Sequence, residues 1–122
     1  MSKIAIVGAG YVGSTAAYAL ILNNVPNEIA LVDIDRSRAE GEAMDLGHGL
    51  QFATGARIVP CTNMEECGGA DIVVITAGKA QKEGETRLDL VKRNAGFFKD
   101  LVPGVAAAAP DALLMVVSNP VD

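Results

Sequence analysis

The chain has 122 residues, half of them apolar, which is enough for one domain with a hydrophobic core. Its formal net charge of -5 disfavours a nucleic-acid partner, because no basic patch could offset the repulsion from phosphates. Two cysteines, Cys61 and Cys67, are too few for a disulfide framework or a zinc site. We therefore expect reduced thiols and no bound metal.

The first residues carry no visible secretion signal. Residues 1–3 lead directly into the apolar run 4–7, which is too short for the apolar core of a signal peptide. The longest apolar stretch, residues 15–22, is well below the ~20 residues that a membrane span needs. These observations predict a cytoplasmic protein that does not enter a membrane.

Short apolar runs alternate with longer segments of helical pattern. We expect strands at residues 4–7, 29–32, 57–59, 72–75 and 113–117, and helices at residues 12–24, 36–52 and 86–109. A polar segment, residues 79–85, precedes the last helix, which Pro103 and Gly104 should kink or split.

This alternation, with its short connections, predicts an α/β fold. A Rossmann-type, doubly wound parallel sheet with right-handed crossovers is the architecture that such a pattern favours. Five strands fit the order 3-2-1-4-5. The sequence offers no candidate for the sixth strand that the complete fold contains.

Three glycines follow the first expected strand in the pattern Gly8-x-Gly10-x-x-Gly13. A strand before it, a helix after it and an acid 20 residues beyond Gly13 make this a predicted dinucleotide-binding loop. Gly8 permits the tight turn, Gly10 lets a pyrophosphate approach the backbone, and Gly13 lets the helix lie close to the strand. The amides of Tyr11 and Val12 would face the phosphates at the positive end of the helix.

The acid is Asp33, at the end of the second expected strand. A carboxylate at this point can accept both ribose hydroxyls and would repel a 2′-phosphate. Asp33 therefore favours NAD over NADP as the cofactor, although Arg36 lies close by.

Two later stretches narrow the prediction. Residues 75–90 read ITAGKAQKEGETRLDL and residues 117–122 read VSNPVD. With the glycine loop, Asp33 and the segment 45–49 (DLGHG), they resemble the L-lactate/L-malate dehydrogenase family, and L-lactate dehydrogenase most closely. The resemblance covers essentially the whole chain and a little more than the first third of a typical member.

The resemblance implies roles for particular residues. Ala77, Gly78 and Val117 would lie along the cofactor, and residues 79–85 resemble the mobile loop that closes over substrate in the family. Arg87 resembles the catalytic arginine that polarises the substrate ketone when that loop closes. A guanidinium suits this role because it stabilises the charge that develops on oxygen.

Gln81 and Asn119 resemble substrate-binding positions. Malate-specific members carry arginine at the position of Gln81, and a neutral amide there favours a 2-keto acid without a second carboxylate, such as pyruvate. Asn119 resembles the asparagine that touches both the nicotinamide ribose and the substrate. His48, the only histidine, falls in a segment that contributes to subunit packing in the family, so we expect no catalytic role for it.

The implied reaction is reversible hydride transfer between NADH and pyruvate. The histidine–aspartate pair that moves the proton, and the arginine that clamps the substrate carboxylate, lie later in family members than residue 122. We therefore expect residues 1–122 to be the NAD-binding (Rossmann) domain, ending before the substrate domain and binding NAD(H) without turnover. An autonomous or engineered non-catalytic module and the same half of a malate dehydrogenase are the alternatives, and a homo-oligomer stays open.

Overall fold

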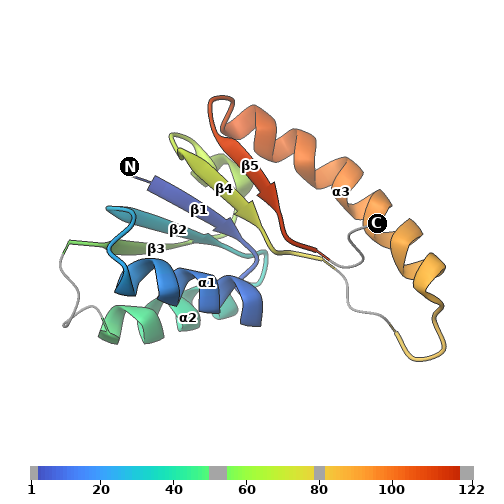
Figure 1. Cartoon of the computed structure of the whole chain (residues 1–122), viewed down its shortest axis with the longest axis horizontal. Coiled ribbons are helices and arrows are strands. Elements are labelled where there is room, and N and C mark those ends of the chain that lie inside the picture. The colour runs from blue at the N-terminus through green and yellow to red at the C-terminus, as the bar shows by residue number, and fades with distance from the viewer. Residues whose placement is uncertain (1–2, 50–54, 79–81, 119–122) are drawn as a thin grey trace.

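The structure is a computed structural model, and it describes residues 3–49, 55–78 and 82–118. Strands and helices alternate along these ranges, as expected (Figure 1). In chain order the elements are β1 (Lys3–Val7), α1 (Tyr11–Leu22), β2 (Glu28–Val32), α2 (Arg36–Gly49), β3 (Arg57–Cys61), the 3-10 helix η2 (Met64–Cys67), β4 (Ile72–Ile75), α3 (Arg87–Ala108) and β5 (Leu113–Val116).

The five strands form one parallel sheet in the order β3-β2-β1-β4-β5, which confirms the predicted topology. Their last residues share one register row across the sheet: Cys61, Val32, Val7, Ile75 and Val116. Because all strands run the same way, the loops that follow them leave from one edge. This carboxyl edge is where open α/β sheets bind ligands.

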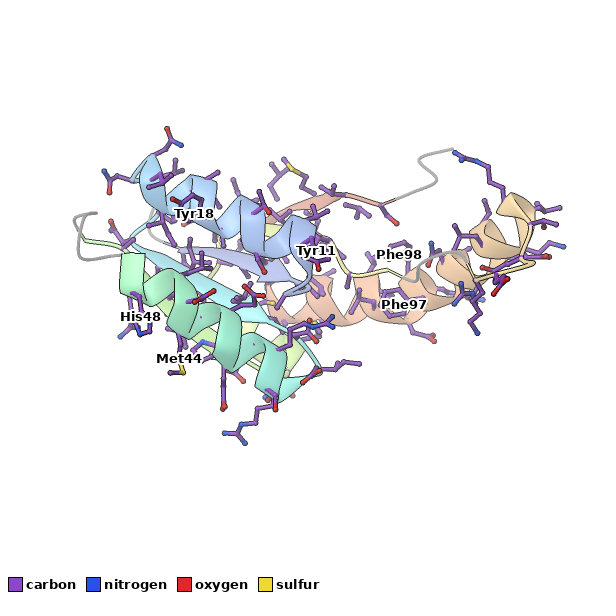
Figure 2. All side chains as sticks on the ribbon, turned by 90° about the horizontal axis from the view of Figure 1, so that it is seen from below. Tyr11, Tyr18, Met44, His48, Phe97 and Phe98 are labelled. Atoms are coloured by element: carbon purple, nitrogen blue, oxygen red, sulfur yellow. The ribbon has the colours of Figure 1, made fainter. Side chains whose placement is uncertain are left out.

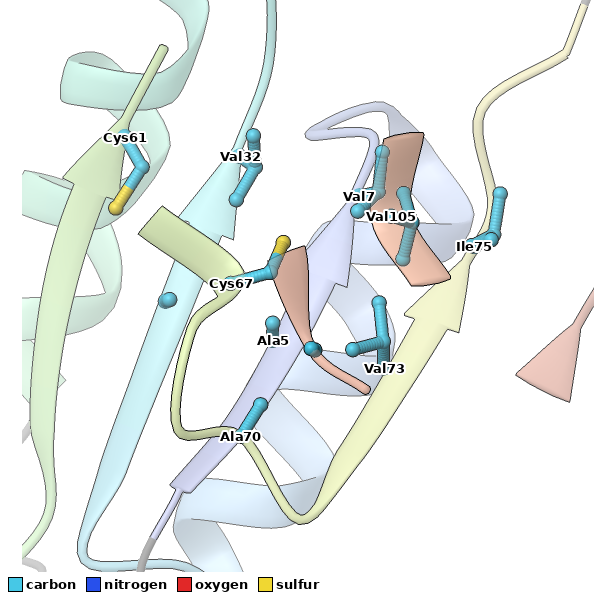
Figure 3. Packing of buried hydrophobic residues seen from close by; sticks show 11 residues of the cluster. Ala5, Val7, Val32, Cys61, Cys67, Ala70, Val73, Ile75 and Val105 are labelled. Atoms are coloured by element: carbon cyan, nitrogen blue, oxygen red, sulfur yellow. The ribbon is translucent and has the colours of Figure 1, made fainter. Parts of the chain in front are cut away.

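Helices cover both faces of the sheet (Figure 1). Ala17 and Ile21 of α1 pack in one buried cluster with Ile4 and Ile6 of β1. On the other face, Val105 of α3 packs over the strands together with η2 (Figure 3). A strand residue points to one face or the other in alternation, so the continuous apolar run of β1 serves both layers.

The strand β3 is longer than predicted and contains Pro60. The amide of Arg57 donates to Asn27 O (2.9 Å) and Cys61 O accepts from the amide of Asp33 (3.0 Å), so these residues face β2. In a parallel ladder every second residue bonds to the partner strand, so Ile58 and Pro60 face away from β2, and Pro60 lies at the open edge of the sheet. A proline is tolerated there because no donor is required.

The sequence predicts a kink or a split at Pro103, and of these two outcomes the split was wrong. The helix continues through Pro103 from Arg87 to Ala108. Packing of Leu101, Val102 and Val105 in the buried cluster over the sheet outweighs the single hydrogen bond that proline removes. None of the helices in the described ranges has the length and apolarity needed to cross a bilayer.

Candidate dinucleotide-binding site

The carboxyl edge brings together the turns that follow β1, β2 and β4. The amide of Gly8 donates to Val32 O (2.7 Å), and the amides of Thr76 and Ala77 donate to Val7 O (2.8 and 2.9 Å). These bonds join the loop after β1 to both neighbouring strands. The segment 8–13, called the glycine loop below, is therefore anchored on either side before α1 begins.

Glycine occupies the three positions of this loop for different structural reasons. Gly8 has a φ of +112°, which only glycine adopts readily, and a Cβ there would lie 2.7 Å from the amide nitrogen of Ala77. A Cβ on Gly13 would overlap the carbonyl oxygen of Gly8. At Gly10, however, a Cβ would meet nothing within 4 Å. Gly8 and Gly13 are thus required by packing, whereas Gly10 leaves open space in front of the backbone.

Internal donors engage three consecutive carbonyl groups of the loop. The hydroxyl of Thr76 donates to Gly8 O (3.1 Å), and the hydroxyl of Ser14 donates to Ala9 O (3.1 Å). The amide of Ser14 donates to Gly10 O (2.9 Å). The negative ends of these peptide groups are consequently turned into the protein.

The first turn of α1 presents the opposite polarity. Within the part of the chain that the structure describes, no acceptor takes the amide of Tyr11 or Val12. These N–H groups stand at the positive end of the helix dipole, where an anion is stabilised. The Tyr11 side chain is 96% exposed and projects away from the protein, so the two amides stay accessible to a ligand (Figure 2). The loop is therefore a fitting cradle for a pyrophosphate.

Asp33 lies where the sequence predicts it, directly after β2, and it also does something unexpected. One carboxylate oxygen accepts from the amide of Ala9 (2.9 Å) and the other from the amide of Asp35 (2.9 Å). Asp33 thereby holds the glycine loop against the end of β2. Each oxygen of a carboxylate can accept a second hydrogen bond, so acceptor capacity for ribose hydroxyls is left over.

Ala77, Gly78 and Val117 also lie at this edge. The amide of Val117 donates to Ile75 O (2.8 Å), and a Cβ on Gly78 would lie 3.4 Å from the hydroxyl of Ser118. The segments that follow β4 and β5 are therefore side by side, next to the glycine loop.

The substrate-side residues are less completely described. Gln81 and Asn119 lie outside the described residues. Arg87 is the first residue of α3, is exposed, and stands where the helix projects beyond the strand ends (Figure 1). The structure thus gathers the predicted cofactor residues that it describes and places Arg87 apart from them.

A capping box and an ion pair fix the chain just before α3. The Thr86 hydroxyl accepts from the amide of Asp89 (3.1 Å), whose carboxylate accepts from the amide of Thr86 (3.2 Å). Glu85 forms a two-bond ion pair with Arg93 (2.8 and 3.0 Å) and accepts from the amide of Lys82 (3.0 Å). The Lys82 amide and the Arg93 guanidinium hold the pKa of Glu85 below its usual range.

The two cysteines are buried in the core between the sheet and the η2/α3 layer (Figure 3). Burial, with a contribution from neighbouring Glu66, raises the pKa of Cys61 to about 12, and burial also raises the pKa of Cys67. Both thiols are therefore protonated at neutral pH and are poor nucleophiles.

One hollow of the surface lies away from the glycine loop. An open space of about 530 Å³ lies between α3 and η2, lined in part by Met64, Arg93, Phe97 and Leu101. None of its lining residues belongs to the glycine loop or is Asp33. We place the site at the carboxyl edge because the oriented peptide groups, the open space at Gly10 and the acid converge there.

The sheet order, the glycine loop and the acid at the end of β2 together define an α/β domain that binds a dinucleotide. The chain belongs to the lactate/malate dehydrogenase family, whose NAD binding domain matches residues 2–122. Its cofactor is accordingly NAD, as the sequence predicts.

Relatives and solved structures agree with this assignment. The chain is 53% identical over 121 residues to an L-lactate dehydrogenase of Clostridium botulinum and 49% identical over 122 residues to that of Acetivibrio thermocellus. It covers 99% and 100% of its own length in these matches but only 38% of each relative. A malate dehydrogenase from Archaeoglobus fulgidus, solved with NADH, superposes with a TM-score of 0.90 at 45% identity, over 97% of this chain and 40% of that one.

A lactate dehydrogenase from a Medee basin deep-sea metagenome library superposes equally well, with a TM-score of 0.90 at 46% identity. That match covers 99% of this chain and 38% of the other. The fold and the family thus agree, while the chain spans about two fifths of the proteins that it resembles.

Proposed function

We propose that this chain is the cofactor-holding part of an NAD-dependent L-lactate dehydrogenase. The observation that carries the proposal is the polarity of the glycine loop, whose carbonyl groups are held inward while the first amides of α1 face outward. The names of the curated relatives support lactate as the substrate.

The residues divide the cofactor between them. The amides of Tyr11 and Val12 bind the pyrophosphate across the open space in front of Gly10. The remaining lone pairs of the Asp33 carboxylate accept hydrogen bonds from the hydroxyls of the adenosine ribose, and its charge repels the 2′-phosphate of NADP. Ala77, Gly78, Val117 and Asn119 line the path toward the nicotinamide.

In the complete enzyme the bound cofactor supplies or receives the hydride. Arg87 stabilises the negative charge that grows on the ketone oxygen, and closure of residues 79–85 brings it in and excludes water. Gln81 and Asn119 contact the substrate. The proton donor and the carboxylate clamp come from a region beyond residue 122, and residues 1–122 bind NAD(H) without turnover.

A malate dehydrogenase is the second candidate, since one close structural match carries that name. The neutral side chain of Gln81 argues against it, because the second carboxylate of oxaloacetate would have no cation at that position. Steady-state rates of the complete enzyme on pyruvate and on oxaloacetate distinguish the two. A higher kcat/KM on oxaloacetate would overturn the lactate assignment.

Titration of the 122-residue chain with NADH and NADPH, followed by cofactor fluorescence or calorimetry, tests the proposed binding. We expect a dissociation constant for NADH that is clearly lower than that for NADPH. No binding of NADH would refute the cofactor role of this chain. A separate observation distinguishes part of an enzyme from an autonomous module: continuation of the reading frame into a segment with the histidine and the aspartate would support the enzyme.

A further inference from the structure

We propose that Thr76 is a positioning residue for the glycine loop, and that its hydroxyl holds the loop in the conformation that receives the pyrophosphate. The inference rests on the proposed cofactor binding and adds a residue to it. Thr76 follows the last residue of β4, between that strand and the glycine loop.

The hydroxyl of Thr76 has two oxygen atoms within reach, Gly8 O at 3.1 Å and Val7 O at 3.3 Å. Val7 O already accepts the amides of Thr76 and Ala77, which fill its two lone pairs. The single hydroxyl proton is therefore directed to Gly8 O. Within the described residues, no other donor reaches Gly8 O.

This contact controls one particular peptide group. The peptide between Gly8 and Ala9 is held at its oxygen by Thr76, from β4, and at its nitrogen by Asp33, from β2. Gly8 lacks a Cβ and has a φ of +112°, so the residue itself restrains this peptide weakly. The two side chains supply the restraint from opposite sides.

The orientation matters for an anionic ligand. If the peptide rotated, its carbonyl oxygen could turn toward the phosphates and oppose the positive end of α1. The Thr76 hydroxyl also fills the space between the loop and the helix, since Cβ atoms on Gly8 and Gly13 would lie 2.7 and 2.9 Å from it. Thr76 thus acts on the pyrophosphate through the backbone, without touching it.

Three substitutions separate the hydroxyl from the shape of the side chain. Thr76→Ser keeps the donor, Thr76→Val keeps the shape without the donor, and Thr76→Ala removes both without crowding Gly8 O. The matched control is Thr15→Val, which makes the same change on an exposed residue of α1. All four are compared with the unmodified 122-residue chain by thermal unfolding and by NADH titration.

We expect the valine and alanine variants to bind NADH about five- to tenfold more weakly, the equivalent of one hydrogen bond. The serine variant and Thr15→Val should stay within about twofold of the unmodified chain. If Thr76 only stabilised the fold, the valine and alanine variants would have a lower melting temperature but would bind NADH normally while folded. Unchanged NADH affinity in both Thr76→Val and Thr76→Ala would overturn the proposal, as would a loss in Thr76→Ser equal to that in Thr76→Val.

Hydrogen exchange by NMR tests the same contact without cofactor. In the alanine and valine variants we expect the amide of Ala9 to exchange about fivefold faster. Exchange at the amide of Ile6 in β1 should change only as much as the change in overall stability, measured by the melting temperature, requires. Unchanged exchange at Ala9 would contradict the proposed restraint of the loop by Thr76, even if the chain bound no NADH. The experiment therefore distinguishes a failure of cofactor binding from a failure of this restraint.

Discussion

Gly10 and Gly13 are three residues apart and are glycines for opposite reasons. A Cβ on Gly13 would overlap a backbone oxygen, which cannot move aside cheaply, whereas a Cβ on Gly10 would project into open space. Gly13 is therefore required for the fold, and the open space at Gly10 supports our proposal that the pyrophosphate approaches the loop there.

We predict that Gly13→Ala destabilises the chain by at least about 1–3 kcal/mol, as overpacking against a rigid neighbour does. Gly10→Ala should change the free energy of unfolding by less than about 1 kcal/mol, because Gly10 has an extended backbone (φ −76°) that alanine adopts. Urea unfolding measures both values. Only Gly10→Ala should then show a folded chain that has lost NADH affinity.

Retention of normal NADH binding by Gly10→Ala would mean that the pyrophosphate does not approach the loop at this point. A Gly13→Ala variant as stable as the unmodified chain would show that α1 can shift away from Gly8.

Asp33 has a structural role besides the ribose recognition that we propose for it. Its carboxylate accepts two backbone amides, so removal of the side chain affects the loop as well as the ribose site. We predict that Asp33→Ser narrows the difference between the dissociation constants for NADH and NADPH. The same variant should lose about 1–3 kcal/mol of stability, since hydrogen bonds to a charged group are lost.

Asp45→Ser is the matched control, because it removes the same charge from an exposed position on α2. This variant should leave both the cofactor preference and the melting temperature nearly unchanged. If the unmodified chain bound NADH and NADPH equally, the discriminating role of Asp33 would be wrong.

At the scale of elements, the sequence predicts the strands best where they are buried on both faces. β4 begins and ends where expected, and β1 and β2 each begin only one residue earlier than predicted. Boundaries near proline are predicted less well, since the effect of proline depends on neighbours that the sequence does not identify. Pro60 lies in an edge strand, and Pro103 lies in a helix that tertiary packing holds together.

The site shows a similar division. The glycine spacing and Asp33 are local patterns, and the sequence alone is enough to propose them as the cradle. The contacts of Thr76 and Ser14 depend on how distant segments meet, so the motif does not reveal them. A hydroxyl directly after a strand that neighbours β1 would have been the available signal for Thr76.

The ion pair between Glu85 and Arg93 fixes the segment that leads into α3. The side chain of Glu85 is only 13% exposed, and both of its oxygens are engaged by Arg93. The lowered pKa of Glu85 means that its stabilising effect is present above its unfolded-state pKa and is lost as pH falls through the folded-state value.

We therefore predict that hydrogen exchange at residues 82–86 speeds up as the pH is lowered below about 4.5, after correction for intrinsic exchange rates. Glu85→Gln should produce the faster exchange at neutral pH and remove much of the pH dependence. Glu83→Gln, at an exposed neighbouring position, is the control. Identical exchange in Glu85→Gln and the unmodified chain at pH 7 would show that the ion pair does not hold this segment.

At the scale of the whole molecule, α2 extends along the sheet from one edge to the other (Figure 1). α2 begins just after Asp33 at the carboxyl edge and ends on the opposite side of the domain. His48 lies twelve residues after Arg36, which is about 18 Å along the helix axis. Figure 2 shows it at the far end of the helical layer from Tyr11. The only histidine of the chain is consequently remote from the cofactor site.

This arrangement leads to the prediction that residues 1–122 bind NADH but do not reduce pyruvate or oxaloacetate at a useful rate. A positioned acid contributes about 10²–10⁴-fold, and fixed orientation of the substrate contributes several kcal/mol more. Arg87 replaces neither, because the residue stands apart from the glycine loop at the start of α3. NADH absorbance, followed with the purified chain and each keto acid, measures the rate. His48→Gln is the control and should leave NADH binding unchanged. Turnover near about 1 s⁻¹ in the unmodified chain, at the low end for enzymes, would show that residues 1–122 suffice for catalysis.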